Sequence, residues 1–357
     1  TLELSSYRLS SHYERLFAPF TVQGKRFLLK GPSLFMDMES AAVGNSSLDH
    51  VTAQISWDGE TRLALSVDEP SSINLDEFYP WLLTHETVKN HMKQFQAFGG
   101  RLALNKLQFQ VPVLQPQNWT FSLEGKAAPF AMDCSFLPSV LNADQVVFSA
   151  DHANLQIMDA QSRLLDAEVT MSGIFHDYTR GLPGIELRIA GNMGPEANRF
   201  VMDLAQLPTE LRVTGPYTVE RCRLKWTHEA HVDFDGDFSW KKDNGVSMSL
   251  QFEKTGEALD IRRLSITDAH SRATASILVE GPRVEVDFSG TLHHTTLDRI
   301  LVKNELLEGT IDGAALARLH LDAPMKSTFR GHLSIEEFKG MWGYREDSMQ
   351  IQKAALE

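Results

Sequence analysis

The segment Val246-Ser-Met-Ser-Leu-Gln-Phe252 alternates apolar and polar side chains without a break. Successive side chains of a β-strand point to opposite faces of the sheet, so this pattern predicts a strand with one apolar and one wet face. The same alternation recurs in Val284–Phe288 and in Ile185–Ile189. Strands of a parallel α/β sheet would instead read as continuous apolar runs. We therefore predict a mainly β chain built from antiparallel strands.

Helical spacing is confined to three segments. We predict helices over Asp76–Phe98, which is followed by two glycines, over Pro195–Leu207 and over Thr296–Val302. These helices are too few to cover the apolar faces of so many strands. The alternation in Arg101–Val111 changes phase near Asn105-Lys106, and one extra residue there predicts a β-bulge.

Internal repeats decide the expected architecture. Leu155–Arg163 recurs as Leu264–Arg272 with six of nine positions identical, and each copy precedes an alternating strand, a glycine and a short helix. The shared Asp-x-x-Ser-Arg is interpreted as a structural corner, because an Asp at the head of a turn bonds its own backbone. We expect one continuous elongated domain, a curled antiparallel sheet of repeated multi-strand units. Its repeats would span 1–98, 99–207 and 208–303, each ending in a helix, and 304–357 as a partial repeat.

Composition excludes several classes of function. The formal net charge of −13 disfavours binding of nucleic acid, which needs clustered Lys and Arg. It also disfavours binding to anionic membranes through a polybasic segment. No apolar run approaches the roughly 18 residues of a membrane-spanning helix. The sequence opens at Thr1 without Met, and we expect a soluble part of something longer. Cys134 and Cys222 are interpreted as two separate buried thiols, although pairing in an oxidising compartment stays open.

Candidate chemical sites are weak. Asp233-Phe-Asp-Gly-Asp237 resembles a calcium loop, but its acids alternate with apolar residues, which favours a solvated strand face and leaves only weak calcium binding open. His228-Glu-Ala-His231 is one residue short of the zinc-protease pattern. His293 and His294 are adjacent, so on a strand they would point to opposite faces and could not chelate together. We predict no enzyme, no catalytic residue, no cofactor and no metal.

The apolar face of every alternating strand needs cover. A second sheet would close it as a sandwich of about 100 residues per module. One long sheet curled along its length would instead leave a trough, which acyl chains can fill because each buried CH₂ contributes about 0.8 kcal/mol. The residues alone do not decide between these two solutions.

A family resemblance favours the trough. Val284–Gly290 with Thr296–Ile300, Asn192–Ala197 and Leu75–Leu82 resemble segments of the AsmA-like proteins of the Gram-negative envelope. The resemblance implies a repeating β-groove in the periplasm, held at the inner membrane by an anchor outside this sequence. It also implies movement of phospholipid between inner and outer membranes, with envelope proteins as further partners. It brings no catalytic residues.

The leading hypothesis is therefore a passive conduit for phospholipid or another acyl-chain lipid. The second is a non-catalytic scaffold or assembly factor for outer-membrane biogenesis with a closed β core. A carbohydrate-binding module is disfavoured because Trp119 and Trp240 lie on the apolar phase. The expected groove lining consists of the alternating apolar residues Val246, Met248, Leu250, Phe252, Val284, Val286, Phe288, Ile157, Ile185, Leu187, Ile189, Leu63, Leu65 and Val67.

Overall fold

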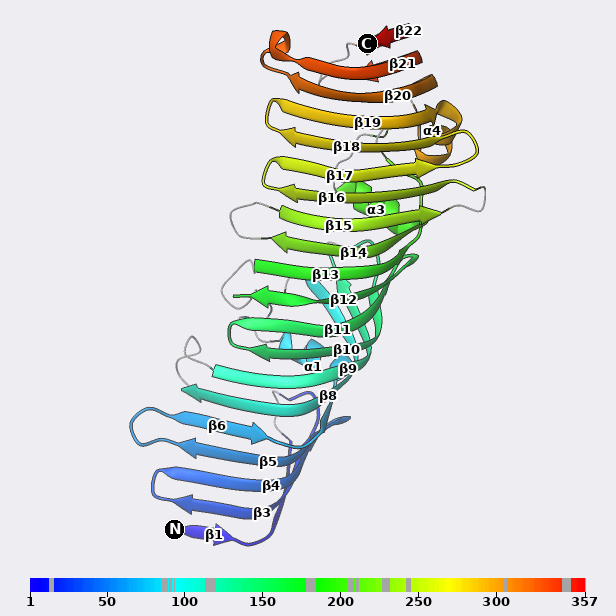
Figure 1. Ribbon diagram of the computed structural model, residues 1–357. Helices are drawn as coiled ribbons and strands as arrows, with labels where there is room; N and C mark the ends of the chain where they lie inside the picture. The colour runs from blue at the N-terminus through cyan, green and yellow to red at the C-terminus, as the bar shows by residue number, and fades with distance from the viewer. Residues whose placement is uncertain are drawn as a thin grey trace. The chain divides into compact units, whose positions relative to one another are not determined.

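The computed structural model in Figure 1 describes most of the chain in two compact units. The described residues are 1–12, 16–84, 86, 89, 92, 94–112, 120–135, 137–177, 184–204, 209, 212–226, 232–241, 245–304, 307–341 and 348–356. Unit 1 comprises Thr1–Leu164 and Thr170–Ile185, and unit 2 comprises Leu165–Val169 and Glu186–Glu357. Trp119 and the His228–His231 motif lie outside the described residues.

Unit 1 is an antiparallel sheet with one described helix. Its elements are β1 (Leu2–Leu4), β2 (Tyr7–Ser11), β3 (Phe20–Lys30), β4 (Ser33–Val43), β5 (Ser46–Ser56), β6 (Arg62–Val67), β7 (Ser71–Asn74), α1 (Leu75–Leu82), β8 (Phe95–Pro112), β9 (Thr120–Cys134), β10 (Leu141–Asp151) and β11 (Asn154–Leu164). From β3 to β6 each strand pairs with the next one along the chain. Strand β5 also pairs with β7, and both β6 and β7 pair with β8. From β8 to β11 each strand again pairs with the next. Strands β12 (Ala167–His176) and β13 (Gly184–Met193) each contain the boundary between the units.

Unit 2 repeats this plan with two described helices. Its elements are α3 (Pro195–Leu204), β14 (Tyr217–Trp226), β15 (Val232–Lys241), β16 (Ser247–Thr255), β17 (Ala258–Thr267), β18 (Arg272–Glu280), β19 (Arg283–His293), α4 (His294–Ile300), β20 (Leu307–His320), β21 (Thr328–Met341) and β22 (Ser348–Leu356), with a 3₁₀ turn at Pro324–Lys326. Each strand from β14 to β21 pairs antiparallel with its successor.

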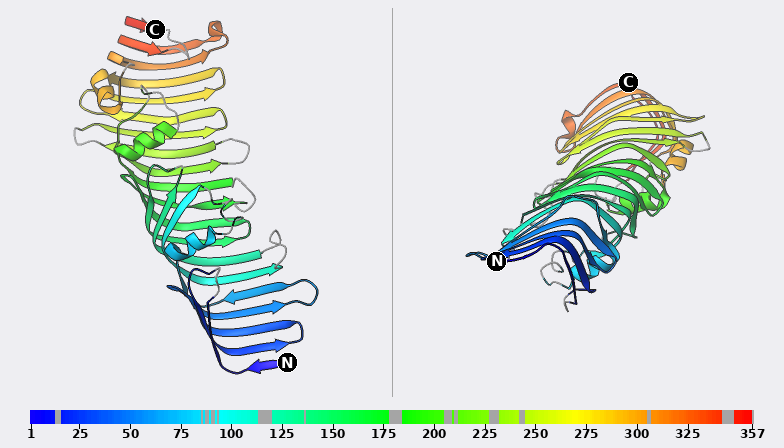
Figure 2. Two further views of the ribbon diagram at one scale, coloured as in Figure 1. Left: turned by 180° about the vertical axis from the view of Figure 1, so that it is seen from behind. Right: turned by 90° about the horizontal axis from the view of Figure 1, so that it is seen from below.

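The strands of both units bend along their length, so each sheet is curled (Figure 2). The predicted fold class is confirmed: the chain is mainly β, with a curled antiparallel sheet and few short helices. The predicted bulge is also confirmed, since the register between β8 and β9 shifts between Leu104 and Lys106.

The prediction of a helix over Asp76–Phe98 is wrong for Phe95–Phe98, which belong to strand β8, whereas Glu86 and Lys89 are helical as predicted. Helix α1 ends at Leu82, and Phe95 begins strand β8. The two glycines that were expected to end the helix lie inside this strand, and so does the predicted repeat boundary at 98/99. Register shifts between Phe95 and Ala97 interrupt the alternation, which gives the aromatic residues a helix-like spacing.

The other two helices lie close to their predicted positions. Helix α3 begins at Pro195, as expected for a proline in the first turn. Helix α4 begins at His294, two residues before the predicted start, because His293 is its N-cap and accepts the N–H of Thr295.

The surface area of the whole chain exceeds what two closed globular units would expose. The chain exposes 21643 Å². Two compact globular units, each with half of the chain, would expose about 17,400 Å² in total. The buried hydrophobic clusters are correspondingly small: one in unit 1 centres on Val51 and Val67, and one in unit 2 on Trp240 and Ile300.

Candidate functional site

Apolar side chains of neighbouring strands in unit 2 lie directly opposite one another and form continuous rows. Residues paired across strands share one face of a sheet, so these rows define what we call the apolar face of unit 2. Row 1 is Phe252, Ile261, Ile277, Val286, Ala317 and Phe329; row 2 is Phe238, Leu250, Leu264, Ala275, Phe288, Ala315 and Gly331; row 3 is Trp240, Met248, Ile266, Ala273, Gly290, Gly313 and Leu333; row 4 is Phe234, Lys254, Leu259, Val279, Val284 and Leu319.

Helix α4 covers only one end of this face. Trp240 and Ile266 of row 3 are 3% and 5% exposed, and they pack with Ile300 of α4 in one cluster. Among the described residues this cluster extends to Met248 and Leu264, but it contains no member of row 1. The residues of row 1 are half-buried. Among the described residues, the buried cluster therefore closes the face at the α4 end and does not reach row 1.

Unit 1 carries a corresponding apolar face. Its rows are Leu4, Phe27, Met36, Ala53, Leu65, Phe109 and Phe121; Leu29, Leu34, Ile55, Leu63 and Val111; Met38, Val51, Val67, Leu107, Leu123, Ala150 and Leu155; and Leu104, Gly125, Phe148 and Ile157. The third row is the most deeply buried, with Val51 at 1% and Val67 at 0% exposure. The first row is mostly half-buried.

Twelve of the fourteen lining residues predicted from the sequence are half-buried side chains in strands. Six lie in the rows of unit 2, namely Met248, Leu250, Phe252, Val284, Val286 and Phe288; three lie in the rows of unit 1, namely Leu63, Leu65 and Ile157; and three lie in β13, namely Ile185, Leu187 and Ile189.

The remaining two predicted residues are placed differently. Val67 and Val246 are fully buried, at 0% and 1% exposure, in the two hydrophobic clusters. Val246 also precedes β16, so it does not belong to the rows of that strand. Both are core residues, and Val67 contributes to the deeply buried third row of unit 1. The sequence did not predict Ile277 and Phe329 as members of the apolar face. Their strands carry small residues on the apolar phase, so the alternation of apolar and polar side chains is weaker there.

The opposite face of unit 2 carries charges in cross-strand pairs. Arg221 lies 3.0 Å from Asp237, and Arg318 lies 3.0 Å from Glu285. Asp235 and Asp237 alternate with apolar side chains in β15, as expected for a solvated strand face. Among the described residues there is no group of three or more His, Cys, Asp or Glu side chains that could hold a metal ion.

A hollow of about 490 Å³ lies in unit 1, lined mainly by residues outside its apolar rows. Gln54, Ala64 and Gln110 line it, and they face one another across β5, β6 and β8 on the phase opposite to Leu65. Leu63 also contributes to the lining. The hollow therefore belongs mainly to the wet side of the sheet.

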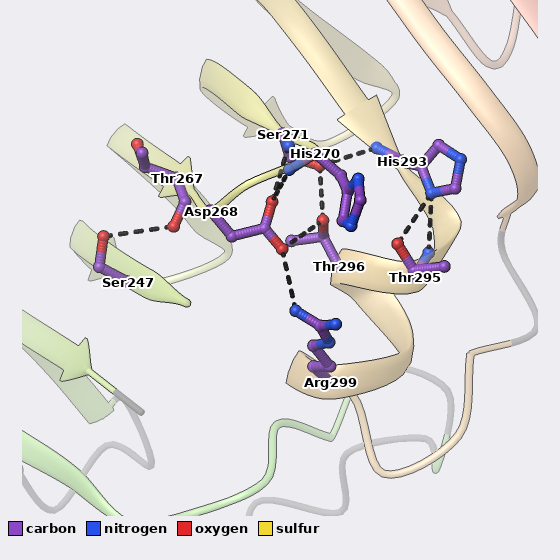
Figure 3. A network of polar contacts seen from close by, with 9 residues as sticks. All are labelled: Ser247, Thr267, Asp268, His270, Ser271, His293, Thr295, Thr296 and Arg299. Carbon is purple, nitrogen blue, oxygen red and sulfur yellow. Dashed lines mark hydrogen bonds and ion pairs between the residues drawn. The ribbon is translucent and has the colours of Figure 1, made fainter. Parts of the chain in front are cut away.

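A buried polar network holds α4 against the turn between β17 and β18 (Figure 3). The carboxylate of Asp268, 1% exposed, accepts the N–H groups of His270 and Ser271 at 2.8 and 2.7 Å. It also accepts the hydroxyl of Thr296 at 2.8 Å, and it lies 3.7 Å from the guanidinium of Arg299. Burial alone would raise the pKa of Asp268, but these hydrogen bonds and the arginine hold the pKa below its usual value. The network is a structural clamp.

The two copies of the repeated motif adopt different conformations. Asp268 heads a turn, as predicted, but the matching Asp159 lies inside β11, so the prediction of a corner is wrong for that copy. Asp166 takes the structural role there, since it accepts the N–H groups of Glu196 and Ala197 at the start of α3, both at 2.8 Å. A carboxylate thus ties the helix to the preceding turn in both repeats.

The adjacent histidines do not point to opposite faces, which corrects the prediction. His293 ends β19 and His294 begins α4, and their ring centroids lie 4.3 Å apart. The ring of His270 lies 5.8 Å from that of His293. Burial lowers the pKa of His293, and the neighbouring His294 and His270 lower it further, against a smaller opposing effect of Asp268 and Asp298.

The stability of unit 2 should therefore fall in mild acid. Neutral His293 accepts the N–H of Thr295 through Nδ1, and protonation removes this acceptor. Because the folded pKa lies below the ordinary 6.5, the contribution is complete above that pH and is lost as the pH falls from there through the folded pKa. We expect His293→Asn, which caps without titrating, to flatten the pH dependence of the unfolding free energy measured in urea. An unchanged slope would contradict this role.

Cys134 and Cys222 are both free thiols, as favoured by the sequence, but only Cys134 is fully buried and Cys222 is half-buried. Burial raises the pKa of each thiol, and a neighbouring aspartate raises it further in each case. Raised pKa values keep the thiols protonated and unreactive at neutral pH.

Comparisons with profiles of protein families, with curated proteins and with solved structures found no match. Within the described residues, no helix combines the length and the apolar character that crossing a bilayer requires.

Proposed function

We propose that this chain is a periplasmic lipid-transfer protein that carries phospholipid acyl chains along the apolar faces of its sheets between the inner and outer membranes. The observation that carries the proposal is the set of largely half-buried rows across β15 to β21, which are apolar except at Lys254 and which, among the described residues, form a buried cluster with helix α4 at one end. The periplasmic location, the inner-membrane anchor and the AsmA-like family belong to the same proposal and rest on the sequence resemblance alone.

The dimensions and chemistry of the rows suit hydrocarbon. Neighbouring strands lie about 4.8 Å apart, so row 1 extends for about 24 Å across β16 to β21. One leaflet of a bilayer contributes about 15 Å of hydrocarbon, half of the whole core. Each CH₂ group withdrawn from water contributes about 0.8 kcal/mol. Side chains such as Val286 and Ile277 recognise apolar length rather than headgroup chemistry, so we expect loose specificity along the rows.

Placing a carboxylate in the middle of the rows should abolish lipid loading. We propose Leu250→Asp and Val286→Asp, each paired with a control on the wet phase of the same strand, Gln251→Asp and Ser289→Asp respectively. A charge against hydrocarbon costs about 2.5–3.5 kcal/mol, which corresponds to roughly a hundredfold weaker binding at that position. Native mass spectrometry and lipid extraction of the purified variants measure the loading, and far-ultraviolet circular dichroism reports the fold.

The expected result is co-purified phospholipid in the wild type and in both controls, and its loss from both apolar variants with the β spectrum retained. Wild-type protein that is monodisperse and free of lipid would contradict the proposal. Unfolding of both apolar variants, with stable controls, would also contradict it, because it would mark these positions as a closed core.

A further inference from the structure

One charged residue lies on the otherwise apolar face of unit 2. Lys254 is in phase with Leu250 and Phe252 along β16, and it stands opposite Phe234 on β15 and Leu259 on β17. Among the described residues of rows 1 to 4, every other member is apolar or glycine. A cation at this position therefore departs from the pattern that all of its neighbours follow.

The ammonium lies at the margin of the face, beside the turn between β16 and β17. Nζ donates to the carbonyl oxygen of Gly256 at 2.8 Å and lies 6.0 Å from the centroid of the Phe234 ring. The side chain is half-buried. Asp233 accepts the N–H of Gly256 at 2.9 Å, which ties the same turn to the neighbouring strand. The aliphatic stem thus lies along apolar neighbours while the charge reaches the rim.

Beyond Lys254, row 4 continues through Leu259, Val279 and Val284 with apolar side chains only. A half-buried ammonium beside hydrocarbon interacts with an anion more strongly than one in bulk water, because the local dielectric constant is lower. Lysine binds phosphate as a compact point charge.

We propose that Lys254 binds the phosphate of a phospholipid whose acyl chains lie across the apolar face of unit 2. This inference rests on the proposed function and adds a headgroup position and an orientation to it. Lys254 and Met248 are six residues apart on β16, about 20 Å along the strand. The headgroup lies at the rim beside Gly256, and the chains run toward the end that α4 seals around Trp240.

The test compares probes that share one alkyl chain. Binding of dodecyl phosphate, dodecyl maltoside and inorganic phosphate below the micellar concentration is measured by calorimetry on the whole chain. The variants are Lys254→Met, which removes the charge at similar length, and Lys254→Arg, which keeps it. Lys241→Met is the matched control, because Lys241 is an exposed lysine at the end of a neighbouring strand.

We expect Lys254→Met to weaken the binding of dodecyl phosphate about tenfold, the effect of one charge-assisted hydrogen bond, and to leave dodecyl maltoside unchanged. Lys254→Arg and Lys241→Met should behave like the wild type, and inorganic phosphate should not compete. Equal loss of both alkyl probes, no loss of either, or competition by inorganic phosphate would overturn the inference. Absence of any alkyl binding to the wild type would instead overturn the proposed function itself, so the two failures are distinguishable.

Discussion

Replacing Gly290 by valine is expected to cost unit 2 about 4 kcal/mol or more and to prevent stable folding of the β18–β19 hairpin. The backbone of Gly290 has a φ of 118°, and a Cβ atom there would lie 2.0 Å from the carbonyl oxygen of Arg272. That oxygen belongs to the paired strand β18, so it cannot move without breaking the ladder. Urea unfolding followed by circular dichroism measures the loss.

The control for this variant is Gly281→Ala in the turn of the same hairpin. Gly281 also has a positive φ, 55°, but no atom lies within 4 Å of its ideal Cβ position. Only the cost of the left-handed backbone remains, about 1–2 kcal/mol. Equal losses for the two variants would show that the close approach of the strands does not determine the cost at Gly290. Gly191 occupies the corresponding position in the preceding repeat, with a φ of 143°.

Trp240→Ala is expected to have the second largest effect, about 3–5 kcal/mol on the unfolding of unit 2. Trp240 is 3% exposed and packs with Ile266 and Ile300, so truncation leaves a cavity between the sheet and α4. Trp57, 43% exposed in unit 1, provides the control, and Trp57→Ala should cost less than about 1 kcal/mol. A loss at Trp240 as small as that at Trp57 would mean that α4 does not seal this end of the apolar face.

The alternation of side chains predicted which face of each strand is apolar, because that property depends only on the two-residue period of an extended chain. It could not predict register. The pairing of Lys254 with Phe234, for example, depends on the connection between β15 and β16. The alternation was also weak where alanine replaces a larger side chain, as at Ala273 and Ala275 before Ile277.

Local similarity misled where tertiary contacts decide the conformation. Asp159 and Asp268 occupy identical places in a shared motif, but only Asp268 heads a turn. Gly191 follows Ser162 by 29 positions and Gly290 follows Ser271 by 19 positions, so the first copy continues as a strand before it turns. The lipid hypothesis, which came from a sequence resemblance, stays a prediction.

The most direct test of the central claim is photo-crosslinking with a phospholipid that carries a diazirine in its acyl chain. The purified protein is irradiated with this lipid, and the modified residues are mapped by mass spectrometry. The account predicts crosslinks to residues of the apolar rows, such as Leu250, Val286 and Phe288, and none to Gln251 or Ser289 on the wet phase of the same strands. Crosslinks spread evenly over both phases, or confined to the loops, would contradict it.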